Sequence, residues 1–195
     1  LKIVCKKEVA SLLIACAMMV TSHGLLYNFF SIYLSEEGYS NSLIGFLWAL
    51  GVCCEIIVFL NMPKILRFLN IRQILLFSLA VAIARFFLIG NYTEYLYLII
   101  LAQTLHAFTF GSFHVASIEL VNKFFTGKNH ARGQAIYNSI TYGLGGTVGG
   151  LGGGYIIEYY SSSTAFTLAA IFPLLGFVII YLGLKRNKIS KSLFD

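Results

Sequence analysis

Apolar residues fill six long stretches of this chain, and short polar segments separate them. Each stretch approaches the roughly 20 residues that a helix needs to cross a bilayer. Helices are favoured because a backbone in hydrocarbon has to satisfy its own hydrogen bonds. The pattern therefore predicts an all-α membrane protein, a six-transmembrane-helix bundle. We expect helices at about residues 9–34, 43–60, 74–89, 95–121, 134–157 and 164–184, between an N-terminal segment 1–8 and a tail 185–195.

Charged residues occupy alternate connections between these stretches. Of the 14 Lys and Arg residues, all but Arg85 fall in the N-terminal segment, the second loop, the fourth loop and the tail. The first, third and fifth loops carry glutamates instead, namely Glu36, Glu37, Glu94 and Glu158. Loops rich in Lys and Arg stay on the cytoplasmic side. We therefore expect a multi-pass protein of the cell inner (cytoplasmic) membrane with both termini cytoplasmic.

Composition agrees with this picture and excludes other classes. Only 11% of the residues are charged, whereas a soluble domain carries about 25%, so the lipid bilayer is the first expected partner. The net charge of +6 does not indicate nucleic-acid binding, because the basic residues sit in short loops. The cysteines Cys5, Cys16, Cys53 and Cys54 lack metal-ligand spacing. We interpret them as small buried apolar residues and expect no disulfide, no metal and no cofactor.

A few ionisable side chains interrupt the apolar stretches. Each costs roughly 2.5–3.5 kcal/mol on insertion scales, so each is a functional candidate, although hydrogen-bonded packing is an equal alternative for any single histidine. A rise of about 1.5 Å per residue places His23 and His106 near the middle of their helices and Glu55 about one turn away. Side chains on the same faces complete an expected substrate and proton pathway. Its residues are His23, Tyr27, Trp48, Glu55, Arg85, His106, His114 and Asn138.

The helix expected at 95–121 has a polar and aromatic stripe. At about 100° per residue, one face carries Gln103, His106, Phe110, His114 and Ser117. Glu119 falls on the opposite side, and we expect it to pair with Lys123 or with a loop arginine. Arg85, on the preceding helix, is expected to hold a carboxylate, either that of Glu55 or that of an anionic solute.

The helix expected at 134–157 contains two glycine ladders with four-residue spacing. They are Gly145/Gly149/Gly153 and Gly146/Gly150/Gly154. Such spacing lets two helices approach closely in lipid, either as a rocking contact or as tight static packing. Of the two prolines, we expect Pro63 to follow the end of helix 43–60 and Pro173 to kink the last helix.

Three segments resemble one transporter family in the same order. Residues 22–56, SHGLLYNFFSIYLSEEGYSNSLIGFLWALGVCCEI, resemble the seventh and eighth helices of the phenylpropionate permease family of the major facilitator superfamily. Residues 105–121, LHAFTFGSFHVASIELV, resemble its tenth helix with paired histidines, and residues 132–150, RGQAIYNSITYGLGGTVGG, resemble its eleventh. The group is similar to lactose permease and the nucleoside–proton symporters.

The resemblance implies half of a major facilitator superfamily fold. Members have twelve spans in two six-helix halves with the solute between them, and this chain matches the C-terminal half. The N-terminal six-helix half, or a second copy, is then an expected partner. In lactose permease the equivalent half uses an arginine on the ninth helix and a histidine and a glutamate on the tenth for proton coupling. Arg85 and His106 or His114 lie on the matching helices, but Glu119 faces away, so Glu55 is the better carboxylate candidate.

We therefore expect the C-terminal half of a secondary active transporter that is not an enzyme. Its reaction would be proton-coupled symport of a small organic solute such as an aromatic acid, sugar or nucleoside. The alternative is a six-span channel or a scaffolding membrane protein. An intramembrane enzyme is disfavoured, because Ser112 and His114, two positions apart on one helix, do not face each other.

Overall fold

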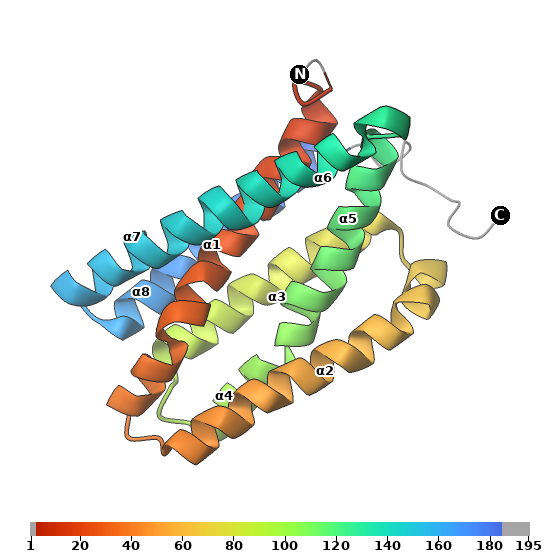
Figure 1. Cartoon of the computed structure of the whole chain (residues 1–195). Coiled ribbons are helices and arrows are strands. Elements are labelled where there is room, and N and C mark those ends of the chain that lie inside the picture. Colours follow the sequence, from red (N-terminus) through yellow and green to blue (C-terminus); the bar gives the residue numbers. More distant parts are fainter. Residues whose placement is uncertain (1–2, 185–195) are drawn as a thin grey trace.

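The computed structural model describes residues 3–184, which form a bundle of six helical rods (Figure 1). Three rods are single helices: α1 (Lys7–Glu36), α2 (Asn41–Phe68) and α3 (Ile71–Asn91). The fourth joins α4 (Leu96–Thr104), the π-helical segment η1 (Ala107–Ser112) and α5 (Phe113–Phe124). After the short η2 (Gly127–Asn129), the fifth joins α6 (His130–Asn138), the π-helical η3 (Ser139–Gly145) and α7 (Gly146–Tyr159). The sixth joins α8 (Ser162–Ala169) and α9 (Ile171–Gly183).

The predicted all-α six-helix bundle is confirmed. Five rods are long and apolar enough to cross a membrane, by length and composition: α1, α2, α3, Leu96–Phe124 and Ser162–Gly183. The rod α6–η3–α7 is not among these five. Glycine, whose hydropathy is near zero, occupies much of its sequence, so its membrane crossing stays a prediction. The expected tail 185–195 and residues 1–2 lie outside the described residues.

Helix α2 departs most from the sequence-based expectation. It continues through Pro63 to Phe68, so the prediction that it ends before Pro63 is wrong. Proline removes one helical hydrogen bond, but membrane helices tolerate that loss when surrounding groups compensate. Cys53 on α2 and Cys5 before α1 are exposed, so the interpretation of all four cysteines as buried is also wrong. α2 is the least enclosed candidate span, with 22% of its apolar window buried, and Cys53 lies on its open side.

The break before Pro173 lies where it was predicted. α8 ends at Ala169 and α9 begins at Ile171, so the sixth rod is interrupted just ahead of the proline. Pro173 has no N–H to offer the carbonyl of Ala169, four residues earlier. The hydroxyl of Ser22 on α1 donates to that carbonyl at 2.8 Å. A side chain from another rod thus satisfies the acceptor that the proline leaves free.

The two glycine ladders face different surroundings. A Cβ atom at Gly145 would lie 2.7 Å from the carbonyl oxygen of Ala17, and Gly149 and Gly153 likewise press on Thr21 and Leu25 of α1. The first ladder is therefore a tight packing seam between α1 and the fifth rod. The second ladder faces side chains at greater distances: a Cβ at Gly146 would meet only Val20 at 4.0 Å, and one at Gly150 or Gly154 would lie 3.2 or 3.1 Å from the side chain of Asn28 or Phe29.

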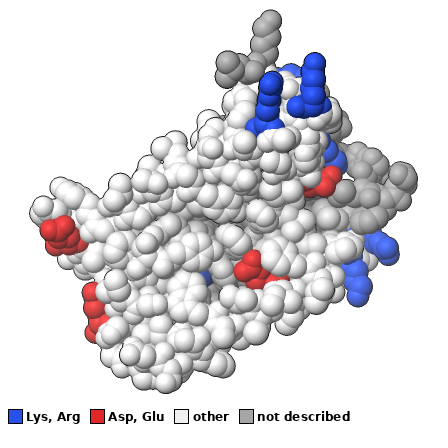
Figure 2. Space-filling view, viewed as in Figure 1, with Lys and Arg blue, Asp and Glu red and all other residues white. Residues whose placement is uncertain are grey.

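Charge divides the bundle into two ends, as Figure 2 shows. Lys and Arg gather at the end where the N-terminus lies, whereas the opposite end carries acidic side chains alone on this face. One acidic group lies between the two ends, and a small basic patch is visible beside it. Which end faces the cytoplasm stays a prediction.

Candidate functional site

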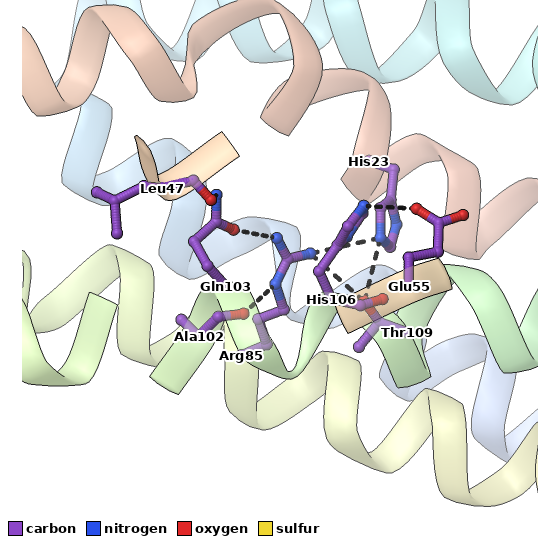
Figure 3. Close-up of polar contacts among 8 residues, drawn as sticks. All are labelled: His23, Leu47, Glu55, Arg85, Ala102, Gln103, His106 and Thr109. Atoms are coloured by element: carbon purple, nitrogen blue, oxygen red, sulfur yellow. Dashed lines mark hydrogen bonds and ion pairs between the residues drawn. The ribbon is translucent and has the colours of Figure 1, made fainter. Parts of the chain in front are cut away.

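Arg85 of α3 forms the centre of a polar cluster inside the bundle (Figure 3). Its side chain is fully buried. Nε donates to the carbonyl oxygen of Ala102 at 2.7 Å, and Nη2 donates to Oε1 of Gln103 at 2.8 Å. Nη1 lies 3.4 Å from Oγ1 of Thr109 and 3.5 Å from Nε2 of His23. These four partners come from α1 and from the fourth rod, so one guanidinium joins three rods.

The partners of Arg85 are neutral groups. Within residues 3–184, no acidic side chain lies within ion-pair distance of it, so Glu55, one of the two carboxylates expected as its partner, does not pair with it in this structure. Depth along the helix, which the sequence supplies, did not reveal that Gln103 and Ala102 lie nearer to the guanidinium. A buried cation whose partners are all neutral keeps its full electrostatic effect on any anion that approaches, because the interior screens charge poorly.

His23 of α1 has one ring nitrogen fixed by the backbone. Its Nδ1 lies 2.9 Å from the carbonyl oxygen of Met19. A carbonyl only accepts, so Nδ1 carries a hydrogen and, in the neutral ring, Nε2 is left as an acceptor. That nitrogen faces Arg85 and, at 3.4 Å, the hydroxyl of Thr109. The arrangement fixes which atom of His23 meets the guanidinium.

His106 and Glu55 form the second part of the cluster. Nε2 of His106 is 3.8 Å from Oε2 of Glu55 on α2, and Nδ1 of His106 is buried without a hydrogen-bond partner among the described residues. Two glycines allow this approach: a Cβ at Gly51 would contact the His106 ring at 3.6 Å, and a Cβ at Gly111 would lie 3.1 Å from Cγ of Glu55. The seam between α2 and η1 thus brings the acid and the imidazole together.

Aromatic rings form the accessible wall beside this cluster. Tyr27 is 46% exposed and stacks on Trp48 with ring centres 6.0 Å apart. The indole N–H of Trp48 donates to Ser31 at 2.9 Å, which ties α2 to α1. Tyr27 also meets the rings of His106 and Phe110 edge-on at 6.2 Å. A solute at this wall meets ring faces first and buried charges behind them.

His114 lies further along the same rod and makes its own contacts. Its Nδ1 is 2.9 Å from the hydroxyl of Tyr142 and 3.5 Å from that of Tyr137. The ring of Phe110 stacks between the two histidines, 5.6 Å from His106 and 5.9 Å from His114. Among the described residues, His114 is therefore linked to the cluster through the apolar ring of Phe110.

The structure brings together seven of the eight predicted site residues. Hydrogen bonds, ion-pair distances or ring contacts connect His23, Tyr27, Trp48, Glu55, Arg85, His106 and His114 through Phe110. Asn138 is exposed, and within residues 3–184 no such contact joins it to the others. Glu119 lies 3.8 Å from Lys123, which confirms one of its two expected partners.

Sequence reasoning missed Thr109 and did not assign Gln103 to the site. Gln103 was on the predicted polar stripe, and its amide bridges Arg85 and, at 3.3 Å, the carbonyl of Leu47 on α2. Thr109 reaches both Arg85 and His23 from within η1. The wider π-helical turn changes which residues share a face, and no periodic pattern in the sequence signals it. The sequence signal that could have pointed to Thr109 was a polar threonine within an otherwise apolar span.

Within the part of the chain described, no three histidine, cysteine or acidic side chains gather as a metal site would require. The polar cluster around Arg85 has a chemistry of its own. It combines a permanent cation, a carboxylate, imidazoles and an accessible aromatic wall. These can attract an anion, hold and release a proton and stack on a planar ring.

Comparison with known proteins gives concordant matches. The model of the MFS_1 like family matches residues 1–168. A probable 3-phenylpropionic acid transporter of Escherichia coli (strain K12) is 30% identical over 159 residues, covering 81% of this chain and 41% of that protein. The transporter YwbF of Bacillus subtilis (strain 168) is 26% identical over 165 residues, covering 85% of this chain and 41% of that protein. This chain thus spans less than half the length of both relatives.

A solved structure shares the fold. The crystal structure of a mutant of the nucleoside transporter NupG superposes with a TM-score of 0.74 at 17% identity, covering 87% of this chain and 47% of that one. At this identity the match establishes architecture alone. It agrees with the expectation that the bundle corresponds to half of a major facilitator fold.

Proposed function

This chain belongs to the MFS_1 like family, and from that premise we propose that it forms the C-terminal six-helix half of a proton-coupled symporter for a small organic solute. The observation that carries the proposal is the buried cluster around Arg85. A cation within a membrane span is costly, and here it is surrounded by neutral partners from two other rods. Such an unpaired cation can attract an anionic solute and release it again during transport.

The proton would be carried by Glu55 and His106. They are the acid and the neighbouring base of the cluster, 3.8 Å apart, and a proton on either changes the net charge facing Arg85. The side chain of Glu55 is 13% exposed and that of His106 is 5% exposed, so access of water to this pair is restricted. Proton binding and anion binding would then favour each other, because each adds a charge opposite to the one that the other adds.

The solute would bind at the aromatic wall of Tyr27 and Trp48, with Asn138 as a further contact and His114 on the proton path. An aromatic acid suits this arrangement best, since its ring can stack and its carboxylate is drawn towards Arg85. Sugars and nucleosides also bear groups that stack on such rings. Alternating access would come from this half rocking against a second six-helix bundle, either an N-terminal half or a second copy.

Uptake by the complete protein in proteoliposomes tests this proposal. With labelled 3-phenylpropionate as the probe, we expect saturable uptake that an inward proton gradient accelerates. Glu55→Gln, which mimics a permanently protonated carboxyl, should lose accumulation against a gradient but retain exchange of solute. Glu119→Gln is the matched control, because that carboxylate pairs with Lys123 away from the cluster. Uptake indifferent to the proton gradient would exclude coupling, and uptake that does not saturate would indicate a channel.

Orientation is tested separately with a cysteine of the chain itself. We propose that the basic end is cytoplasmic in the inner membrane, with both termini there. Cys5 is exposed beside that end. A membrane-impermeant maleimide should label it in inside-out vesicles but not in intact right-side-out vesicles, and the reverse pattern would invert the topology.

A further inference from the structure

A groove separate from the buried cluster lies between α1 and the fifth rod. Its volume is about 630 Å³, within the range of about 300–1,000 Å³ typical of small-molecule sites. Its lining includes Tyr27, Asn28, Tyr142, Gly146, Thr147 and Gly150. Arg85 and His23, by contrast, have no exposed surface, so a solute reaches the groove without touching either of them.

The polar atoms along the groove are uncharged, and several of them keep free acceptor lone pairs. The amide of Asn28 donates to the carbonyl of Gly24 at 2.6 Å, which leaves its Oδ1 open. The hydroxyl of Thr147 donates to a backbone carbonyl at 2.7 Å and keeps its lone pairs. The hydroxyl of Tyr27 has no hydrogen bond within residues 3–184. A ligand that suits such a lining is uncharged there and brings its own hydrogen-bond donors.

The groove exists because glycine forms part of its wall. Gly146 and Gly150 belong to the second ladder, while the ladder beside it makes the packing seam with α1. A Cβ at Gly146 would meet only Val20, at 4.0 Å, and one at Gly150 would meet the side-chain nitrogen of Asn28 at 3.2 Å. The absence of side chains on this stripe leaves room for a ring beside Tyr27.

Tyr27 connects the groove to the charged cluster. Its ring lines the groove and also lies 6.0 Å from the ring of His23 and 6.2 Å from that of His106. We propose that this groove binds the uncharged, hydroxyl-bearing ring of the transported solute, while the cluster behind Tyr27 is kept for the solute's charge and the proton. The inference rests on the proposed transport function and adds the chemical class of the ring and the side chains that select it.

Two probes that differ by one hydroxyl test the selection. They are 3-phenylpropionate and its ring-hydroxylated analogue, 3-(3-hydroxyphenyl)propionate. One hydrogen bond is worth a factor of about 2–12 in affinity, so we expect the hydroxylated probe to have a KM lower by that factor. Asn28→Ala should abolish the difference between the KM values of the two probes. Equal KM values in the wild type, or a preference that Asn28→Ala leaves intact, would overturn the inference.

A steric probe tests the location. Gly146→Leu directs a side chain into the groove from a position where a Cβ has ordinary contacts, and we expect the KM of both probes to rise at least tenfold. Gly152→Leu is the control, because it lies on the same helix, its Cβ meets nothing within 4 Å and it does not line the groove. If both variants behave like the wild type in saturable uptake, the groove is not the site and the transport proposal stands.

Two other outcomes have distinct meanings. If Gly146→Leu lowers the fraction of assembled protein in size-exclusion chromatography while KM is unchanged, a protein partner fills the groove, and the inference is wrong. If the wild type neither binds nor takes up either probe, both this inference and the proposed aromatic-acid transport are wrong.

Discussion

The packing seam between α1 and α7 gives the sharpest prediction about the fold. In Gly149→Ala, the new methyl would overlap the carbonyl oxygen of Thr21 and lie 2.8 Å from its carbonyl carbon. Real Cβ atoms essentially never approach another heavy atom more closely than 3.0 Å. Backbone atoms cannot rotate away as a side chain does, so α7 and α1 would have to separate, and the neighbouring contacts of Gly145 and Gly153 would loosen with them.

The change in the free energy of unfolding of Gly149→Ala follows from two opposing effects. Overpacking a well-packed contact costs about 1–3 kcal/mol, whereas glycine to alanine within a helix gains up to about 1 kcal/mol of helix propensity. Gly152→Ala is the matched control, because its methyl enters open space and only the gain applies. We therefore expect the free energy of unfolding of Gly149→Ala to be lower than that of the control by about 1–3 kcal/mol. For a chain of this length that difference corresponds to a Tm lower by about 2–12 °C.

Thermal unfolding of the two purified variants in the same detergent provides the measurement. Intrinsic fluorescence of Trp48, the one tryptophan of this sequence, reports the separation of α2 from the rest of the bundle when any tryptophan outside this sequence is replaced by phenylalanine. Equal Tm values for Gly149→Ala and Gly152→Ala would refute the assignment of the Gly145/Gly149/Gly153 ladder as the contact with α1. A lower Tm for Gly152→Ala would point to the opposite face of the helix.

Three further predictions concern single contacts. Gln103→Glu gives Arg85 a carboxylate partner, which cancels the electrostatic potential of the guanidinium. The KM for uptake of the phenylpropionate anion should then rise about tenfold, while uptake of any neutral solute stays unchanged. Equal effects on the two solutes would refute this electrostatic role of Arg85. Ser22→Ala should lower the free energy of unfolding by about 1–3 kcal/mol, because it leaves the buried carbonyl of Ala169 unpaired. The same change should cost little in the Pro173→Ala background, where the backbone N–H of residue 173 can donate to that carbonyl. Additive losses in the double variant would contradict this. Trp48→Phe removes the indole N–H that donates to Ser31 of α1. It should raise the KM for 3-phenylpropionate with little change in Tm, and uptake and thermal unfolding of the same variant measure the two quantities.

The sequence predicted the rods because long apolar stretches bounded by alternating basic and acidic loops leave few other arrangements. It also predicted that His23, Glu55, Arg85 and His106 share one polar region, since ionisable groups within membrane spans have reason to avoid lipid. It did not predict the partners of Arg85. Depth and face are properties of one helix, whereas the contact with Gln103 depends on how two helices rotate against each other.

The π-helical segments explain most of the remaining differences. η1 and η3 alter the relation between position and face on the two rods that carry His106 and Tyr142. Residue periodicity assumes a constant turn of about 100°, so it missed Thr109, which lies within η1. The path of α2 through Pro63 was missed for a different reason, because a local rule about proline took no account of the tertiary setting of the helix.

In the proposed transporter, movement of the solute and movement of a proton are linked through Glu55 and His106. The most direct test of this link is the pH change outside lightly buffered proteoliposomes that contain the complete protein, after addition of 3-phenylpropionate without any imposed gradient. The account predicts an alkalinisation as protons enter with the solute, present in the wild type and in Glu119→Gln and absent in Glu55→Gln. Solute entry without any pH change in the wild type would contradict it.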